Sequence, residues 1–237
     1  MIRTTLVSGA RRGIGAAAAL HLLGLGWNVS VGIRDGAVPD WAGAPDLAPH
    51  RERLHVATYD AAEPGAEMAW AASARERFGA IDSIIANAGI AHKGSVIEVG
   101  EAQMDEMIAV NVLAPQRLAR AVWDDLSAHG AGRVIILSSL SGKRVKAAAM
   151  GAYSVSKFAV TGLAHALRHA GFDSGIRATA VCPGLVSTDM GRAVSDRSPQ
   201  KMTDARDLAR IIAMLIDLPN EASVAEFAIN CRLEESF

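Results

Sequence analysis

Tyr153 and Lys157 stand four residues apart in the run Gly151-Ala-Tyr-Ser-Val-Ser-Lys-Phe. Residues at this spacing share one face of a helix, so a phenol and an ammonium group would lie side by side. An isolated tyrosine titrates at a pKa near 10. A neighbouring cation favours the phenolate, so we expect Lys157 to lower the pKa of Tyr153 toward the range of efficient acid–base catalysis. Such pairs also occur by chance on solvated helix surfaces, so the interpretation depends on other residues.

A glycine-rich run lies between the first predicted strand and the helix that follows it. It reads Ser8-Gly9-Ala10-Arg11-Arg12-Gly13-Ile14-Gly15. Its glycines allow a tight turn and a close approach of the backbone to a pyrophosphate, and the helix N-terminus attracts the negative charge. The strand before it and the helix after it are the context that gives such a motif meaning. The spacing differs from that of nucleoside triphosphatases, so we predict a dinucleotide site rather than a plain structural turn.

Three further motifs follow the fourth, fifth and sixth predicted strands. They are Ala86-Asn87-Ala88-Gly89, Ser138-Ser139-Leu140-Ser141-Gly142 and Cys182-Pro183-Gly184. Ligands of open parallel sheets bind at the carboxyl ends of the strands, where these motifs would meet. Each motif alone is also explained by a turn, or by serines that satisfy backbone groups.

Asn111 lies inside a long predicted helix that starts near Glu101. Pro115, four residues later, has no N–H, so the carbonyl of Asn111 lacks its helical partner. We expect a kink there that can hold a water molecule. The alternative is a buried asparagine with a merely structural hydrogen bond.

In this order and spacing, the motifs resemble those of classical short-chain dehydrogenases/reductases. The resemblance runs from the first strand to about Met190 and implies a catalytic set of Asn111, Ser139, Tyr153 and Lys157. In that family the catalytic serine is followed by x-x-Gly, which selects Ser139. Its interval of 14 residues to Tyr153 is one more than the commonest family spacing, so Ser138 and Ser141 remain alternatives.

The same resemblance implies the residues that bind cofactor and substrate. The implied cofactor contacts are Gly9, Arg11, Arg12, Gly13, Ile14, Gly15, Arg34, Asp60, Ala61, Asn87, Ala88, Gly89, Tyr153, Lys157, Pro183, Gly184, Val186, Thr188 and Met190. The implied substrate contacts are Ser139, Leu140, Met150, Tyr153 and Leu185. The basic run Lys143-Arg-Val-Lys146 either attracts an anionic substrate or is a solvated loop.

The end of the second predicted strand bears on the choice of nicotinamide cofactor. NAD-preferring relatives place an acidic residue at the position of Ile33, to bind the ribose 2′-hydroxyl. Ile33 cannot do this, whereas Arg34 and Arg12 stand where NADP-preferring relatives place arginines. One charge-assisted hydrogen bond is worth about 1.5–3 kcal/mol. We therefore expect NADPH to be preferred over NADH, unless Asp35 offsets the two arginines.

Composition limits the class of protein. The chain has 237 residues, a formal net charge of −1 and 50% hydrophobic residues, which suits one large α/β domain and argues against a basic nucleic-acid binder. The sequence shows neither a signal-peptide pattern nor an apolar run of about 18 residues. Cys182 and Cys231 have no metal-ligand spacing, and His165 and His169 are expected on a solvated helix face. We expect a cytoplasmic protein without a metal site or a membrane span.

Short apolar runs alternate with helix-like segments, which predicts a single-domain α/β fold of the Rossmann type over residues 1–237. The expected core is a doubly wound parallel sheet of about seven strands with helices on both faces. The candidate strands are residues 4–8, 28–33, 54–59, 81–86, 133–138, 176–182 and 224–229, and helices are expected to start near residues 13, 62, 101, 151 and 204. Residues 35–53, with three prolines, are expected to be loose, and residues 189–203 to form a short substrate loop.

The sequence therefore predicts an NADP(H)-dependent oxidoreductase acting on a ketone, an aldehyde or a secondary alcohol, with a 3-oxoacyl compound as one candidate. The alternatives are a non-catalytic NADP-binding regulator, which should lack Tyr153 or Lys157, a halohydrin dehalogenase, and a dehydratase or epimerase. We expect a homodimer through the helix of Tyr153, or a homotetramer. The last glycine is Gly191, so the terminal glycines that are common in tetrameric relatives are missing.

Overall fold

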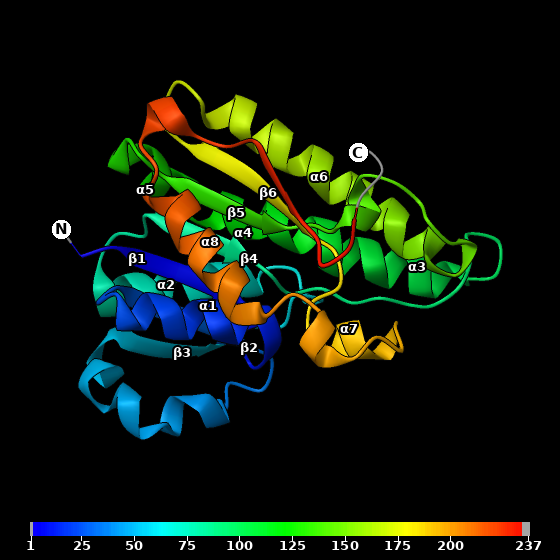
Figure 1. The fold of residues 1–237 in the computed structure, drawn as a ribbon. Coiled ribbons are helices and arrows are strands. Elements are labelled where there is room, and N and C mark those ends of the chain that lie inside the picture. The colour runs from blue at the N-terminus through cyan, green and yellow to red at the C-terminus, as the bar shows by residue number, and fades with distance from the viewer. Residues whose placement is uncertain (1, 234–237) are drawn as a thin grey trace.

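A parallel sheet of seven strands forms the centre of the molecule (Figure 1). The computed structural model describes residues 2–233. The strands lie in the order β3-β2-β1-β4-β5-β6-β7, and all neighbouring pairs are parallel. Their bounds are Thr4–Ser8 (β1), Asn28–Ile33 (β2), Leu54–Thr58 (β3), Ser83–Ala86 (β4), Arg133–Leu137 (β5), Arg177–Pro183 (β6) and Glu226–Ile229 (β7). The predicted doubly wound α/β fold is confirmed.

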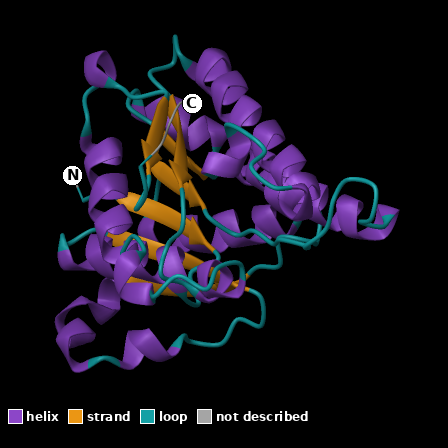
Figure 2. Ribbon diagram, turned by 45° about the vertical axis from the view of Figure 1, so that its right-hand side comes forward, coloured by secondary structure: helices purple, strands orange, loops and turns teal. Residues whose placement is uncertain are grey.

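Helices cover both faces of the sheet (Figure 2). Their bounds are Gly13–Gly24 (α1), Ala66–Phe78 (α2), Glu101–Ile108 (α3), Ala114–Ala121 (α4), Trp123–His129 (α5), Gly151–Gly171 (α6), Asp189–Ala193 (α7) and Ala205–Asp217 (α8). One face is covered by α1 and α8, and the other by α2, α4 and α6. Within residues 2–233, no helix is long and apolar enough to cross a bilayer.

Alternate residues of the central strands belong to two separate cores. On β1, Leu6 packs with the helices of the α2 side, whereas Val7 packs with those of the α1 side. Ile84 and Ile85 of β4 divide in the same way. Since both faces are covered, the strands are apolar throughout instead of alternating with polar residues.

The strand order reverses between β1 and β4, and their carboxyl ends are tied together. The hydroxyl of Ser8 accepts hydrogen bonds of 3.0 Å from the backbone N–H groups of Asn87 and Ala88. The side-chain amide of Asn87 donates to the carbonyls of Ser8 and Gly9, each at 3.0 Å. These bonds fix the glycine loop over the crevice in which open α/β sheets bind ligands.

Two segments differ from the sequence prediction. The helix expected from residue 62 begins at Ala66, because Pro64 and Gly65, whose φ is 95°, interrupt the chain before it. The segment of residues 35–53, expected to be loose, contains 3-10 helices at Asp40–Gly43 and Pro45–Arg53. Its Ala42 and Leu47 are buried, and the second 3-10 helix packs against α1. Prolines oppose an α-helix here, but short turns with i→i+3 bonds tolerate them.

Candidate active site

Tyr153 and Lys157 lie in the first two turns of α6, and both are buried. Tyr153 is 8% exposed and Lys157 is 5% exposed. The ammonium of Lys157 lies 5.6 Å from the centre of the Tyr153 ring and donates a 2.8 Å hydrogen bond to the carbonyl of Leu137, at the end of β5. The pair is therefore not a solvated surface pair, which was the alternative left open by its spacing.

Burial dominates the acidity of both residues. It raises the pKa of Tyr153 to about 12, while the nearby Ser139 hydroxyl acts in the opposite direction. Burial also lowers the pKa of Lys157 to about 8. The expectation that Lys157 brings the pKa of Tyr153 down toward neutrality is wrong here, because surroundings of low dielectric disfavour both charged forms. At neutral pH the pair consists of a neutral phenol and an ammonium group.

Ser138 and Ser139, two of the three candidate serines after β5, have different surroundings. Ser138 is 4% exposed, and its hydroxyl is bonded to Thr161 Oγ1 at 2.6 Å and to the carbonyl of Lys157 at 3.2 Å. Ser139 Oγ accepts the N–H of Ser141 at 3.1 Å and donates to the carbonyl of Pro183 over a long 3.4 Å. The Ser139 hydroxyl thus makes longer hydrogen bonds than the Ser138 hydroxyl does to Thr161. Ser139 is also the serine beside Tyr153.

Asn111 occupies a π-turn, Ala109–Leu113, between α3 and α4. The disruption that Pro115 predicts is therefore present. Asn111 is 1% exposed, and its side chain accepts the N–H of Ile90 at 2.9 Å and donates to the carbonyl of Ile90 at 2.9 Å. A further bond of 3.0 Å joins it to Ser156 Oγ on α6. Asn111 thus fastens the loop after β4 to α6, one residue from Lys157.

Gly89 closes the space between these groups. A Cβ atom added to Gly89 would lie 3.2 Å from Asn111 Oδ1 and 3.7 Å from Lys157 Nζ. The structure thus brings Gly89, Asn111, Ser139, Tyr153 and Lys157 together. The long interval between Ser139 and Tyr153 is taken up by 3-10 turns at Leu140–Gly142 and Ala148–Met150.

The glycine loop has the geometry of a backbone cradle. Gly9 and Gly13 have φ values of 64° and 63°. A Cβ atom at Gly9 would lie 2.9 Å from Ala88 Cα, and one at Gly15 would lie 2.5 Å from the carbonyl oxygen of Gly9. Within the described chain, no side chain caps the N-terminus of α1, and its first turn, which includes Ile14, contains no acidic residue. The loop therefore fits the pyrophosphate of a dinucleotide, with its N–H groups and helix dipole directed at the charge.

The three arginines expected at the cofactor each have an acidic partner. Arg11 is paired with Asp35, Arg12 with Asp189 at 2.9 Å, and Arg34 with Asp60 at 3.4 Å. Asp35 also accepts the N–H of Ala37, and this bond is the largest cause of its lowered pKa. Its ion pair is with Arg11 and not with Arg34. Exposed ion pairs of this kind are worth only about 0–1 kcal/mol. A phosphate group can therefore compete with the carboxylates for Arg12 and Arg34.

The loop after β6 lies beside the glycine loop. Thr188 caps α7, since its hydroxyl accepts the N–H of Gly191 at 3.2 Å. Its methyl group would lie 3.2 Å from a Cβ atom on Gly13. Val186 is buried and bridges to Thr203, whereas Met190 is 43% exposed. Of the predicted contacts after β6, Thr188 thus lies next to Gly13 of the glycine loop.

The predicted substrate contacts lie around Tyr153 and Ser139. Met150 packs in a small cluster with Tyr153 and Met107. Leu140 is buried, and its Cδ1 would lie 3.2 Å from a Cβ atom on Gly184. Leu185 is half-buried, and its carbonyl accepts the N–H of Thr203 at 3.0 Å. Of the predicted substrate contacts, Met150 is thus the one that packs beside the Tyr153 side chain.

Sequence reasoning missed a support of the glycine loop. The indole N–H of Trp41 donates a 2.9 Å hydrogen bond to the carbonyl of Ala10. Trp41 belongs to the proline-containing segment of residues 35–53. That segment therefore supports the glycine loop and is not merely a loose connection. A tryptophan among prolines was the available signal, because such a residue in an otherwise polar stretch needs an apolar partner.

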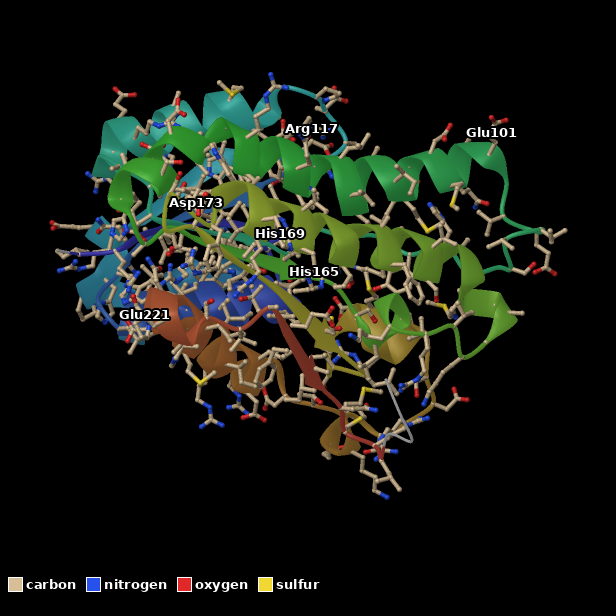
Figure 3. The ribbon with its side chains drawn as sticks, turned by 90° about the horizontal axis from the view of Figure 1, so that it is seen from above. Glu101, Arg117, His165, His169, Asp173 and Glu221 are labelled. Carbon is tan, nitrogen blue, oxygen red and sulfur yellow. The ribbon has the colours of Figure 1, made fainter. Side chains whose placement is uncertain are left out.

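Glu226 on β7 binds two residues that were singled out from the sequence. Its carboxylate is paired with Lys143 and lies 2.6 Å from His165 Nε2. Lys143 is therefore not part of a solvated loop. His165 is bonded to this carboxylate although its side chain is 40% exposed, and His169, which Figure 3 labels on the same helix, is exposed. Pairing with an edge strand distant in sequence could not be read from the i, i+4 spacing.

Comparisons with known proteins agree with this geometry. The family model described as short chain dehydrogenase matches residues 3–199. Agropine synthesis reductase of Rhizobium rhizogenes is 35% identical over 230 residues, which are 97% of this chain and 52% of the relative. The chain thus spans about half the length of that relative. Acetoacetyl-CoA reductase of Rhizobium meliloti (strain 1021) is 28% identical over 94% of this chain and 88% of the relative.

A similar solved structure is a short chain dehydrogenase from Burkholderia cenocepacia J2315 in complex with NADP. It is 27% identical, with a TM-score of 0.87 over 97% of this chain and 96% of that chain. The similarity extends over the sheet, the glycine loop and α6 alike.

Proposed function

The chain belongs to the short-chain dehydrogenase/reductase family, and we propose that it catalyses reversible hydride transfer between NADP(H) and a carbonyl or secondary alcohol carbon. The observation that carries this proposal is the convergence of Ser139, Tyr153 and Lys157 beside Gly89, at the carboxyl ends of the central strands. The similarity to acetoacetyl-CoA reductase adds 3-oxoacyl thioesters to the candidate substrates.

The cradle formed by Gly9, Gly13 and Gly15 would hold the pyrophosphate, and Thr188 and Gly89 would border the nicotinamide end. A bound nicotinamide supplies the hydride in reduction and accepts it in oxidation. Arg12 and Arg34 are exposed and only weakly held by Asp189 and Asp60, so they are available for a 2′-phosphate. Ile33 is 2% exposed and belongs to the core, so it offers a ribose hydroxyl no acceptor. These features support NADPH over NADH.

Three side chains would carry the proton chemistry. Ser139 accepts the N–H of Ser141, its contact to the Pro183 carbonyl is long, and its hydroxyl lies beside the phenol of Tyr153, so it can donate to a substrate oxygen placed there. Tyr153 is protonated at neutral pH and would transfer its proton to that oxygen as the carbonyl carbon receives hydride. Lys157 would stabilise the phenolate left behind. The Asn111 carbonyl would hold the water through which the proton is replaced.

An exposed apolar face suggests how the chain associates. Val155 and Phe158 on α6 are 42% and 44% exposed, and Leu113 in the neighbouring π-turn is 47% exposed. Burying such a face stabilises association by about 25 cal/mol per Å² of apolar surface. We therefore expect a homodimer formed through α6.

The test is consumption of NADPH across a panel of ketones, aldehydes and 3-oxoacyl thioesters, with NADH measured in parallel. The expected result is turnover of at least one carbonyl class with a lower KM for NADPH than for NADH. Tight NADPH binding without turnover of any class would instead favour a non-catalytic regulator. A lower KM for NADH would refute the cofactor preference.

A further inference from the structure

An ion pair between α2 and α4 lies next to the segment that follows β3, where the adenine of the cofactor is expected to bind. Glu67, in the first turn of α2, is 1% exposed, and Arg117 on α4 donates to its Oε1 from Nε at 2.9 Å. A second guanidinium nitrogen of Arg117, Nη2, donates to the carbonyl of Ala61 at 2.8 Å. Figure 3 labels Arg117 on α4, the helix that packs against α2.

Glu67 also holds the two ends of the segment between β3 and α2. Its Oε2 accepts the N–H of Gly65 at 3.1 Å, and its Oε1 accepts the hydroxyl of Tyr59 at 3.4 Å. Together with the bond from Arg117 to Ala61, these contacts fix the segment at three points. Among the described residues, Arg117 is the cation paired with Glu67.

Asp60 lies between two of these fixed points. Its Oδ1 accepts the N–H of Ala62 at 3.0 Å, and its Oδ2 is paired with Arg34 at 3.4 Å. Asp60 and Ala61 are the residues proposed to contact the adenine, and Arg34 is proposed to contact the 2′-phosphate. The side chain of Arg117 therefore helps to fix the position of Asp60 and Ala61, through its hydrogen bond to the carbonyl of Ala61.

A planar guanidinium can serve two acceptors in fixed directions at once, whereas a lysine ammonium is a point charge on a flexible stem. Arg117 uses this property: Nε binds the carboxylate and Nη2 binds the carbonyl. The same helical run begins at the π-turn of Asn111, so one element supports both ends of the crevice.

We propose that Arg117 is a positioning residue for adenine recognition, acting through Ala61 and Asp60 with Glu67 as its anchor. This inference rests on the proposed function, since it assumes that an adenine dinucleotide binds in the crevice. Arg117 would touch neither cofactor nor substrate. Its loss should therefore weaken binding of the adenine end and leave the chemistry at Tyr153 unchanged.

The test compares Arg117→Lys with Arg120→Lys, a control at an exposed position on the same helix. Lysine at position 117 keeps a charge opposite Glu67 but cannot make both bonds. Calorimetric titration with adenosine 2′,5′-bisphosphate should show an affinity about tenfold lower for Arg117→Lys, as expected for the loss of one positioned hydrogen bond. With a carbonyl substrate from the panel, KM for NADPH should rise by a similar factor while kcat at saturation is unchanged. Arg120→Lys should match the wild type in both measurements.

A double variant, Arg117→Gln with Glu67→Gln, removes both charges together and covers the case in which Arg117→Lys does not fold. It should show the same loss of adenosine bisphosphate affinity. Wild-type affinity in either folded variant would overturn the inference, as would an equal fall in kcat and kcat/KM. A wild-type protein that binds adenosine 2′,5′-bisphosphate but reduces no carbonyl compound would refute the proposed function alone. If the wild type does not bind the bisphosphate, both proposals fail.

Discussion

At neutral pH Tyr153 is a neutral phenol and Lys157 is an ammonium group, and this favours one direction of proton transfer. A phenol with a pKa raised to about 12 keeps its proton until a strong base develops next to it. The oxygen of a carbonyl that is receiving hydride becomes such a base. Lys157, with a pKa lowered to about 8, keeps its charge at neutral pH and can stabilise the phenolate. The residues are therefore suited to reduction near neutrality.

The first prediction concerns pH. Lys157 is cationic below its pKa of about 8 and neutral above it, so kcat/KM for reduction should be constant at neutral pH and fall as pH rises through this value. The measurement is a pH profile of kcat/KM, with thermal stability recorded at each pH. An Arg side chain stays charged throughout, so the residual activity of Lys157→Arg should lack the break. A wild-type profile that stays flat to pH 10 or above would contradict the assignment.

The second prediction distinguishes the catalytic role of Ser139 from the structural role of Ser138. Ser139→Ala should lower kcat by about 10²–10³-fold without changing the melting temperature, since it removes a donor to the developing oxyanion. Ser138→Ala should keep most of the activity but lower the unfolding free energy by about 0.5–1.5 kcal/mol, because it removes the buried hydrogen bonds of the Ser138 hydroxyl to Thr161 and to the Lys157 carbonyl. Steady-state kinetics and thermal melts on both variants check this. The opposite pattern would make Ser138 the catalytic serine.

At the scale of elements, the junction of β1, the glycine loop and α1 is the most constrained part of the crevice. Asn87 and Ala88 after β4, and Trp41 from the segment after β2, hold the loop from two other parts of the chain. The backbone of the loop is thus rigid before any ligand binds, which lowers the entropic cost of binding. The loop also leaves no room for side chains at its glycines.

The third prediction tests that lack of room. Gly15→Ala places a Cβ atom 2.5 Å from the carbonyl oxygen of Gly9 and 2.6 Å from Asn87 Nδ2, so the loop must shift. NADPH affinity, measured by fluorescence titration, should fall at least about tenfold. The matched control is Gly162→Ala on α6, where a Cβ atom meets nothing within 4 Å. That control should bind NADPH normally and gain about 0.5–1 kcal/mol of stability. Equal NADPH affinities in the two variants would argue against a phosphate cradle.

Local signals predicted most of these elements, and long-range contacts explain the exceptions. Some signals determine the local conformation of the backbone, so their effects could be predicted from the sequence. They are the apolar runs of β1 and β4, the glycines of the loop, and Pro115. The sequence favoured Ser139 but did not exclude Ser138, because the difference is a bond from Ser138 to Thr161, about three turns into α6. Trp41, Glu67 and Arg117 were missed for the same reason, since their partners come from other segments. The direction of the Tyr153 pKa shift depends on burial, which spacing alone does not give.

At the scale of the whole molecule, we expect the exposed face of α6 to decide the state of association. The fourth prediction is that Phe158→Glu converts a dimer into a monomer, because a charge in the centre of an apolar interface is costly to desolvate. Light scattering coupled to size exclusion measures this. The matched control is Met68→Glu on α2, which replaces a side chain of 59% exposure on another helix and should leave the dimer intact. A wild-type monomer, or a Phe158→Glu dimer, would contradict the expected interface.

The central claim is that Tyr153 donates the proton in an NADPH-dependent carbonyl reduction, and Tyr153→Phe tests it most directly. The variant keeps the ring and removes only the hydroxyl, so folding and NADPH affinity should remain at wild-type levels. Single-turnover oxidation of NADPH, with the best substrate of the panel, should slow by at least about 10²–10⁴-fold. Turnover at the wild-type rate in a variant that binds NADPH normally would contradict the assignment of Tyr153 as the proton donor.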